Sequence, residues 1–160
     1  MKLLLFFLAL TLSVVSKAQV TKVSLQANGL TCSMCSNSIF KSLKTVNFVD
    51  KIEANIKTST FEITFKPGSS IDFAVLKDKV EDAGYSVAKF IATVRCKDVK
   101  VQSNSPVKIG NVTLRFFASG EQSLNGDKQV RVMNKGFVSA KELKKINLQQ
   151  QPLGIYYVMI

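Results

Sequence analysis

The sequence predicts an α+β protein in which a ferredoxin-like βαββαβ sandwich is followed by a small β-rich segment with one helix. The first observation is the order in which the apolar period changes between Val20 and Phe90: strand, helix, strand, strand, helix, strand. The second is that short alternating runs separated by turn residues predominate beyond Ile91. The third is a capping box in this second part, where Glu142 follows Ser139 at the spacing that marks a helix start.

The first part contains four runs typical of strands and two with helical spacing. Alternating apolar residues indicate strands at residues 20–27, 50–56, 60–65 and 85–94, with a hairpin turn at 57–60. Apolar residues three and four positions apart indicate helices at residues 35–46 and 73–83. Pro67 and Gly68 end the third strand, and Gly84 stands where a glycine commonly ends a helix. This order predicts two helices on one face of an antiparallel sheet.

The second part contains further strand-like runs, at residues 97–102, 111–118, 128–134 and 154–160, and one helix at 139–148. The helix lies between the third and fourth of these strands, and this element order leads us to expect a small barrel that resembles an OB-fold. The expected organisation is a signal peptide at 1–18, a ferredoxin-like domain at 19–90 and a basic β-rich domain at 91–160.

Residues 1–18 have the three-part pattern of a secretory signal peptide. Lys2 precedes an apolar run from Leu3 to Val15, and the small residues Ser16 and Ala18 follow it. Because the run is shorter than the roughly 18 to 20 residues that span a bilayer, we expect cleavage after Ala18 rather than a retained anchor. The mature protein is then expected to be periplasmic or secreted, in an oxidising compartment.

The net charge of +11 is concentrated in the second part of the chain. Residues 19–90 carry nine basic and seven acidic side chains, net +2, whereas residues 91–160 carry eleven and four, net +7. Such an excess can mark a surface for nucleic acid or for a membrane. Because export separates the protein from nucleic acid, we expect no nucleic-acid partner and instead contact with an anionic envelope surface.

The stretch NGLTCSMC at residues 28–35 places Cys32 and Cys35 between a glycine loop and a helix start. Three uses are open for this pair: a soft-metal clamp, a redox dithiol or a structural disulfide. A helix N-terminus lowers thiol pKa values, and thiolates without histidine partners suit Cu(I) or Hg(II), whereas structural zinc needs four ligands. The chain has no tryptophan, which disfavours a thioredoxin-like dithiol, and a bridge across so short a loop stabilises little.

The segment GLTCSMC resembles the GMTCxxC loop of the heavy-metal-associated domain of copper chaperones, metal-transporting P-type ATPases and the periplasmic mercury-binding protein. The segment EDAGYSV at residues 81–87 resembles the second signature of that family, and the resemblance covers about Val20 to Phe90. Leu30 stands where the family usually has methionine, a change that a buried apolar position tolerates. The resemblance implies Cys32 and Cys35 as metal ligands, in a loop surrounded by Gly29, Leu30, Thr31 and Tyr85.

The same resemblance implies a metal-binding protein without catalytic activity, namely a Cu(I) chaperone or scavenger. Periplasmic Hg(II) binding and thiol–disulfide exchange at the same CxxC are the alternatives. The implied partner is a metal-transporting ATPase or another thiol-containing metal acceptor.

Two other sulfur-containing residues could add to the site. Met34 lies between the two cysteines and is expected to face solvent as a spacer, with a thioether ligand as the alternative. Cys96 lies eleven residues beyond Tyr85, which is roughly 35 Å along an extended strand, and is expected to be a half-buried strand residue. The alternatives for Cys96 are an intermolecular disulfide or a third metal ligand reached by a chain reversal.

Overall fold

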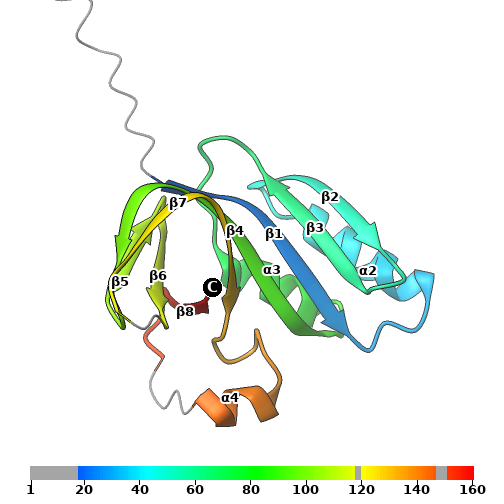
Figure 1. Ribbon diagram of the computed structural model, residues 1–160. Coiled ribbons are helices and arrows are strands. Elements are labelled where there is room, and N and C mark those ends of the chain that lie inside the picture. Colours follow the sequence, from blue (N-terminus) through cyan, green and yellow to red (C-terminus); the bar gives the residue numbers. More distant parts are fainter. Residues whose placement is uncertain (1–17, 118–119, 147–150) are drawn as a thin grey trace, which may run out of the picture.

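The computed structural model describes residues 18–117, 120–146 and 151–160 (Figure 1). Almost all of the expected signal peptide, together with the ends of the runs predicted at 111–118 and 139–148, lies outside these residues. None of the helices in the described ranges has the length and apolar character needed to cross a membrane.

The ferredoxin-like order expected for the first part is confirmed. Its elements are β1 (Ala18–Asn28), α2 (Ser33–Lys44), β2 (Val49–Asn55), β3 (Thr60–Phe65), α3 (Phe73–Asp82) and β4 (Ser86–Val101). The strands pair antiparallel, and Figure 1 shows both helices against the same face of the sheet. The helix faces that the apolar spacing marked, including Ile39 and Leu43 in α2 and Leu76 and Val80 in α3, are fully buried.

The second part extends this sheet. Its elements are β5 (Pro106–Ile109), β6 (Val112–Phe116), β7 (Gln122–Val132), α4 (Ala140–Ile146) and β8 (Ile155–Met159). The expected capping box is confirmed at α4, because the Glu142 N–H donates to Ser139 Oγ at 3.3 Å and the Ser139 N–H donates to Glu142 Oε2 at 3.3 Å. The short strand β5 was not expected from the sequence, and the run predicted at 97–102 is the second half of β4.

The barrel expected for the second part is not found among the described residues. All eight strands lie in one open sheet, in the order β2-β3-β1-β4-β7-β8-β6-β5, in which only β6 and β8 are parallel. The physical reason is that β7 pairs with β4, so the new strands continue an existing sheet and do not close on one another. Alternation of apolar residues is the same for an open sheet and a barrel, and it does not specify which strand is the neighbour.

Strand β4 joins the two parts, and the boundary expected after Phe90 falls inside it. Its first half pairs with β1, where Phe90 lies opposite Leu25. Its second half pairs with β7, where Val94 lies opposite Lys128. The pairings overlap along β4, because Ala92 lies opposite both Val23 of β1 and Val130 of β7.

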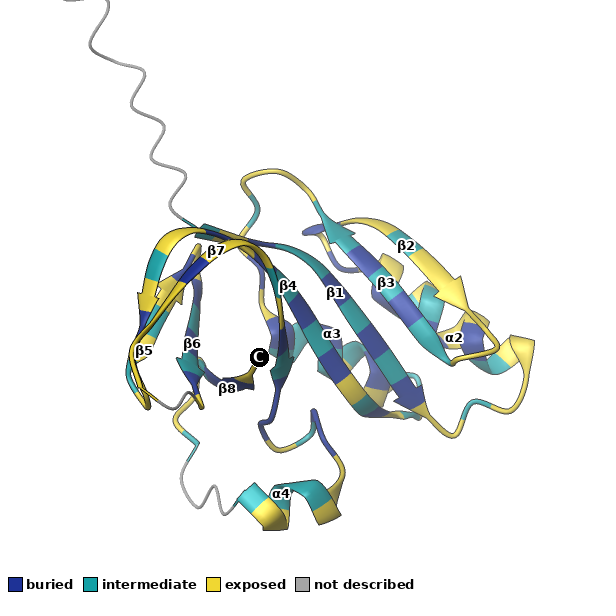
Figure 2. Cartoon of the chain, viewed as in Figure 1, coloured by how far each residue is buried: buried dark blue, intermediate teal, exposed yellow. Residues whose placement is uncertain are grey.

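The apolar core also crosses the expected boundary, and Figure 2 shows buried segments on strands of both parts. The ring centroid of Phe90 lies 5.0 Å from that of Phe73 and 5.0 Å from that of Phe137. The ring of Tyr156 in β8 lies 4.9 Å from Phe73, and its hydroxyl donates to Asp72 Oδ1 and accepts the Ala74 N–H, each at 3.0 Å. A side chain of the second part therefore helps to cap α3 of the first part.

We expect the Phe137→Ala substitution to destabilise the whole protein by about 3 to 5 kcal/mol, because it leaves a cavity between Phe90 and Tyr156. The matched control is Phe117→Ala, since Phe117 directly follows β6 and is 39% exposed. This substitution should lower the stability by about 1 kcal/mol or less. Urea unfolding, followed by far-UV circular dichroism, measures both. Equal losses for the two variants would mean that the aromatic contacts across the boundary do not hold the two parts together.

Candidate metal-binding site

The cysteine loop lies at the end of the sheet where β1 stops and β4 starts. Asn28 pairs with Ser86 there, so Gly29, which follows β1, and Tyr85, which precedes β4, are brought together. Gly29 has a φ of +79°, and a Cβ built on it would lie 4.0 Å from Cδ1 of Tyr85. Leu30 and Tyr85 are half-buried and pack against the core, whereas Thr31 is exposed. The structure thus places Tyr85 beside Gly29 and packs Leu30 against the same core, while the roles of these residues around a metal stay a prediction.

The two cysteines lie at the N-terminus of α2. Cys32 is the N-cap residue, with φ −146° and ψ 160°, and Cys35 is the third residue of the helix. The Cys35 N–H donates to Cys32 Sγ at 3.3 Å, so the sulfur satisfies one of the free donors of the first turn. In this structure the two sulfurs are joined as a disulfide, and the Cα atoms are 5.4 Å apart. Cys32 is exposed to solvent and Cys35 is half-buried.

The electrostatic surroundings favour thiolates once this disulfide is reduced. The first turn of α2 contains no acidic residue, while Lys41 and Lys44 lie in its last turn. The partial positive charge of the helix N-terminus and its N–H groups therefore act on the sulfurs without an acidic side chain in the same turn. The described residues contain no group of three or more histidine, cysteine or carboxylate side chains placed to share an ion. The loop thus offers two sulfurs, the ligand set that suits a soft ion of low coordination number.

Met34 and Cys96 do not join the loop sulfurs. Met34 is 79% exposed, as expected for a spacer. Cys96 is 4% exposed and lies opposite Ala18 at the start of β1 and Gly126 in β7. Since the loop follows the other end of β1, ten residue steps or about 33 Å separate it from Cys96. Burial raises the pKa of the Cys96 thiol, which disfavours the thiolate needed to bind metal.

Ser36 is a residue of this site that the sequence reasoning missed. It is buried in the turn of α2 that carries Cys35, and its N–H donates to the Cys32 carbonyl at 3.3 Å. Its hydroxyl has no hydrogen-bond partner among the described residues. The available signal was its spacing, because Ser36 precedes the buried Ile39 and Leu43 at three and seven positions on the same helix face.

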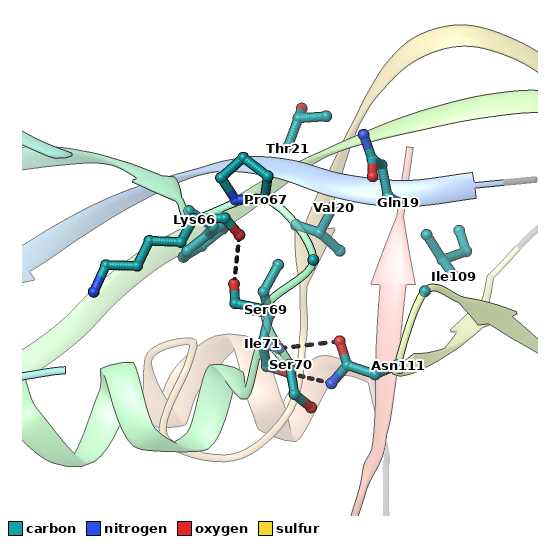
Figure 3. Close-up of a pocket in the computed structure, with 13 residues that line it drawn as sticks. Gln19, Val20, Thr21, Lys66, Pro67, Ser69, Ser70, Ile71, Ile109 and Asn111 are labelled. Carbon is teal, nitrogen blue, oxygen red and sulfur yellow. Dashed lines mark hydrogen bonds between the residues drawn. The ribbon is translucent and has the colours of Figure 1, made fainter. Parts of the chain in front are cut away.

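A separate hollow lies at the opposite end of β1, and Figure 3 shows the residues around it. It is formed by the start of β1, the loop between β3 and α3, and the turn between β5 and β6. Asn111 ties these segments together, since its side chain accepts the Ile71 N–H at 3.0 Å and donates to the Ile71 carbonyl at 2.6 Å. Neither loop cysteine lines this hollow, so it is separate from the cysteine loop.

A ferredoxin-like sandwich with a CxxC pair at the start of its first helix is an arrangement that suits a small domain binding a soft metal ion. Residues 24–86 match the family described as the heavy-metal-associated domain, and this part of the chain is such a domain. The family match covers the cysteine loop and ends just beyond Tyr85.

One curated relative is a probable copper-exporting P-type ATPase of Archaeoglobus fulgidus, which is 32% identical over 83 residues. The match covers 52% of this chain but only 10% of the relative, so the chain spans about a tenth of that protein's length.

Two solved structures are similar to the first part of the chain. Oxidised MerP from Ralstonia metallidurans is 30% identical, with 44% of this chain and 96% of that chain covered and a TM-score of 0.38. The yeast copper transporter domain Ccc2a, studied in apo and Cu(I)-loaded states, is 27% identical, with coverage of 42% and 90% and a TM-score of 0.37.

We expect Gly29→Ala to destabilise the oxidised protein by about 1 to 2 kcal/mol, because residues other than glycine rarely adopt a positive φ. The matched variant is Gly29→Asn, which should lose less because asparagine tolerates this conformation better. Thermal unfolding of the two variants measures the difference. An added Cβ would make only an ordinary contact with Tyr85, so we expect no steric clash. If Gly29→Asn were less stable than Gly29→Ala, side-chain size and not the backbone conformation would explain the loss of stability.

Proposed function

We propose that this protein is an exported carrier or scavenger of Cu(I), which holds one ion between the thiolates of Cys32 and Cys35 and performs no catalysis. The observation that supports this most strongly is the pair of cysteines at the N-terminus of α2, where Cys32 is exposed and Cys35 is half-buried. Among the described residues, no further histidine, cysteine or carboxylate side chain is placed to share an ion with them. Cu(I) is soft and is satisfied by two or three sulfur ligands, whereas zinc and the harder ions need more. Hg(II) shares this ligand preference and is the alternative cargo.

Metal loading requires the dithiol form of the pair. The Cys32–Cys35 disulfide has no thiolate to offer, so a dithiol reductant must first pass two electrons and two protons to the pair and become a disulfide itself. A purely structural role for the bridge is weakly supported, because it closes a loop of only three residue steps and constrains the unfolded chain little.

Release of the ion is proposed to occur by ligand exchange with a thiol-containing acceptor. Because Cys32 is exposed and Cys35 is half-buried, an incoming thiolate has free access on the Cys32 side of the loop. A metal-transporting ATPase is the proposed acceptor, and the similarity of 83 residues of this chain to part of a probable copper-exporting ATPase supports it.

The pattern of residues 1–18 supports export to a periplasmic or extracellular location. The net +7 charge of residues 91–160 supports contact with an anionic envelope surface, and the proposed export separates the protein from nucleic acid.

Anaerobic titration of the reduced protein, with a chromogenic Cu(I) chelator as competitor, tests this function. We expect one Cu(I) per chain, and no binding by the Cys32→Ser/Cys35→Ser double variant, since serine hydroxyls are poor ligands for a soft ion. The matched control is Cys96→Ser, which removes the third thiol and should keep the affinity within about twofold. The oxidised protein should not bind.

Stoichiometric binding by the double variant, or a loss of more than about tenfold for Cys96→Ser, equivalent to about 1.4 kcal/mol, would contradict the assignment. Repeating the competition with Hg(II) compares the two cargoes directly. If the protein, compared with the chelator, binds Hg(II) more tightly than it binds Cu(I), mercury would be favoured as the cargo.

A further inference from the structure

The outer face of β6, β8 and β7 carries five side chains of a kind that often forms protein interfaces. Tyr156 and Val158 of β8 point into the core, so the alternating Tyr157 and Met159 lie on the opposite face of the sheet. On either side of β8, Arg115 lies opposite Tyr157 and Arg131 lies opposite Met159. We call this set the arginine–aromatic patch; it consists of Arg115, Phe117, Arg131, Tyr157 and Met159. Tyr157 is only 6% exposed, so the surface that a partner can reach is that of Arg115, Phe117, Arg131 and Met159.

Contacts with Tyr157 hold Arg115 in place on one side of this patch. Its guanidinium carbon lies 5.4 Å from the centroid of the Tyr157 ring, and Nη1 donates to the Tyr157 hydroxyl at 3.2 Å. Its Nε is buried and has no hydrogen-bond partner among the described residues. The Phe117 ring stacks on the other part of Tyr157, at 5.6 Å between centroids and 30° between planes. The guanidinium is therefore oriented before any partner arrives, which lowers the entropy lost on binding.

The charge of Arg115 is not balanced by the chain itself. All eleven carboxylate side chains of the sequence lie in the described residues, and none forms an ion pair with Arg115. Arg131 differs, because its Nη2 donates to Glu142 Oε1 of α4 at 2.7 Å. This half-buried cation has lost part of its hydration, and it has the contacts with Tyr157 but no ion pair in return. A carboxylate from outside would offset that loss.

Apolar surface surrounds this cation. Phe117 is 39% exposed and Met159 is 44% exposed, although both are large apolar side chains. Arginine, aromatic residues and methionine are the types enriched in protein interfaces, whereas lysine and glutamate are depleted there. The patch contains no lysine, although the same part of the chain carries many.

We propose that the arginine–aromatic patch docks an acidic, partly apolar segment of a partner protein, with a carboxylate on Arg115 and an apolar side chain against Phe117 and Met159. A planar guanidinium recognises a carboxylate through paired hydrogen bonds, and Nη2 is the donor that Tyr157 does not use. The net charge of +7 in residues 91–160 attracts such a segment from a distance. Figure 1 shows β6 and β8 at the other side of the molecule from α2, so docking here leaves the cysteine loop free.

The test uses the full mature protein and a capped six-residue peptide of alternating glutamate and leucine, followed by two-dimensional NMR. The control peptide has glutamine in place of glutamate, so the two differ only in the carboxylates. We expect the acidic peptide alone to shift the amide signals of β6 and β8, and we expect binding to weaken as salt is added. Arg115→Gln should weaken it at least tenfold.

Two further variants keep the result interpretable. Lys108→Gln removes one charge from the exposed edge strand β5 and should change the affinity less than twofold. Arg115→Lys keeps the charge but loses the planar donor pair, and it should bind several-fold more weakly than the native protein. If Arg115→Gln fails to fold, as judged by circular dichroism, the lysine variant carries the comparison.

Equal binding of the acidic and amide peptides, or undiminished binding by both Arg115 variants, would overturn the proposal. Vesicles containing phosphatidylglycerol form the competing arm of the experiment. If the protein binds these vesicles and not the peptide, the patch recognises a lipid surface, and the proposal of an acidic protein segment is wrong.

Discussion

Strand β4 is the constraint on which the rest of the structure depends. Over sixteen residues it pairs with β1 on one edge and with β7 on the other, so a single strand belongs to both parts of the chain. Without β7, the edge of β4 beyond Phe90 would expose unpaired backbone groups, and pairing with β7 satisfies them. It also fixes which side chains of the second part reach the first, since Tyr156 and Phe137 can meet Phe73 and Phe90 only in this arrangement.

The cysteine loop depends on the same pairing at its other end. Because β1 and β4 end side by side, Tyr85 lies against the turn at Gly29 and supports the loop from the core side. The helix that follows begins at a sulfur, so the N–H groups of its first turn face the pair of cysteines. Cys32 is therefore exposed, whereas Cys35 is half-buried and Leu30 and Tyr85 pack against the core beside it.

Charge separates the two parts more clearly than packing does. The first part balances its basic and acidic side chains almost completely, and the acidic partner in most of its ion pairs is largely open to solvent, so these pairs contribute little to stability. The second part keeps a large positive excess, and Arg115 holds an unbalanced charge in a defined orientation beside apolar side chains. The positive charge of the second part thus has two components. The lysines produce a positive potential over the surface, whereas the guanidinium of Arg115 is oriented and, in our proposal, recognises a partner through its geometry.

The sequence by itself determined the local features: the strand and helix order of residues 20–90, the capping box at Ser139 and Glu142, and the position of Cys32 and Cys35 at a helix start. These depend on neighbours within a few residues, through apolar periodicity and side-chain capping. Only the tertiary structure decided that β7 pairs with β4, that β6 and β8 are parallel, and that Tyr156 caps α3. Strand pairing depends on contacts between residues far apart in the chain. The alternation of apolar residues within one strand is the same whichever strand lies beside it, so the sequence pattern does not identify the neighbour.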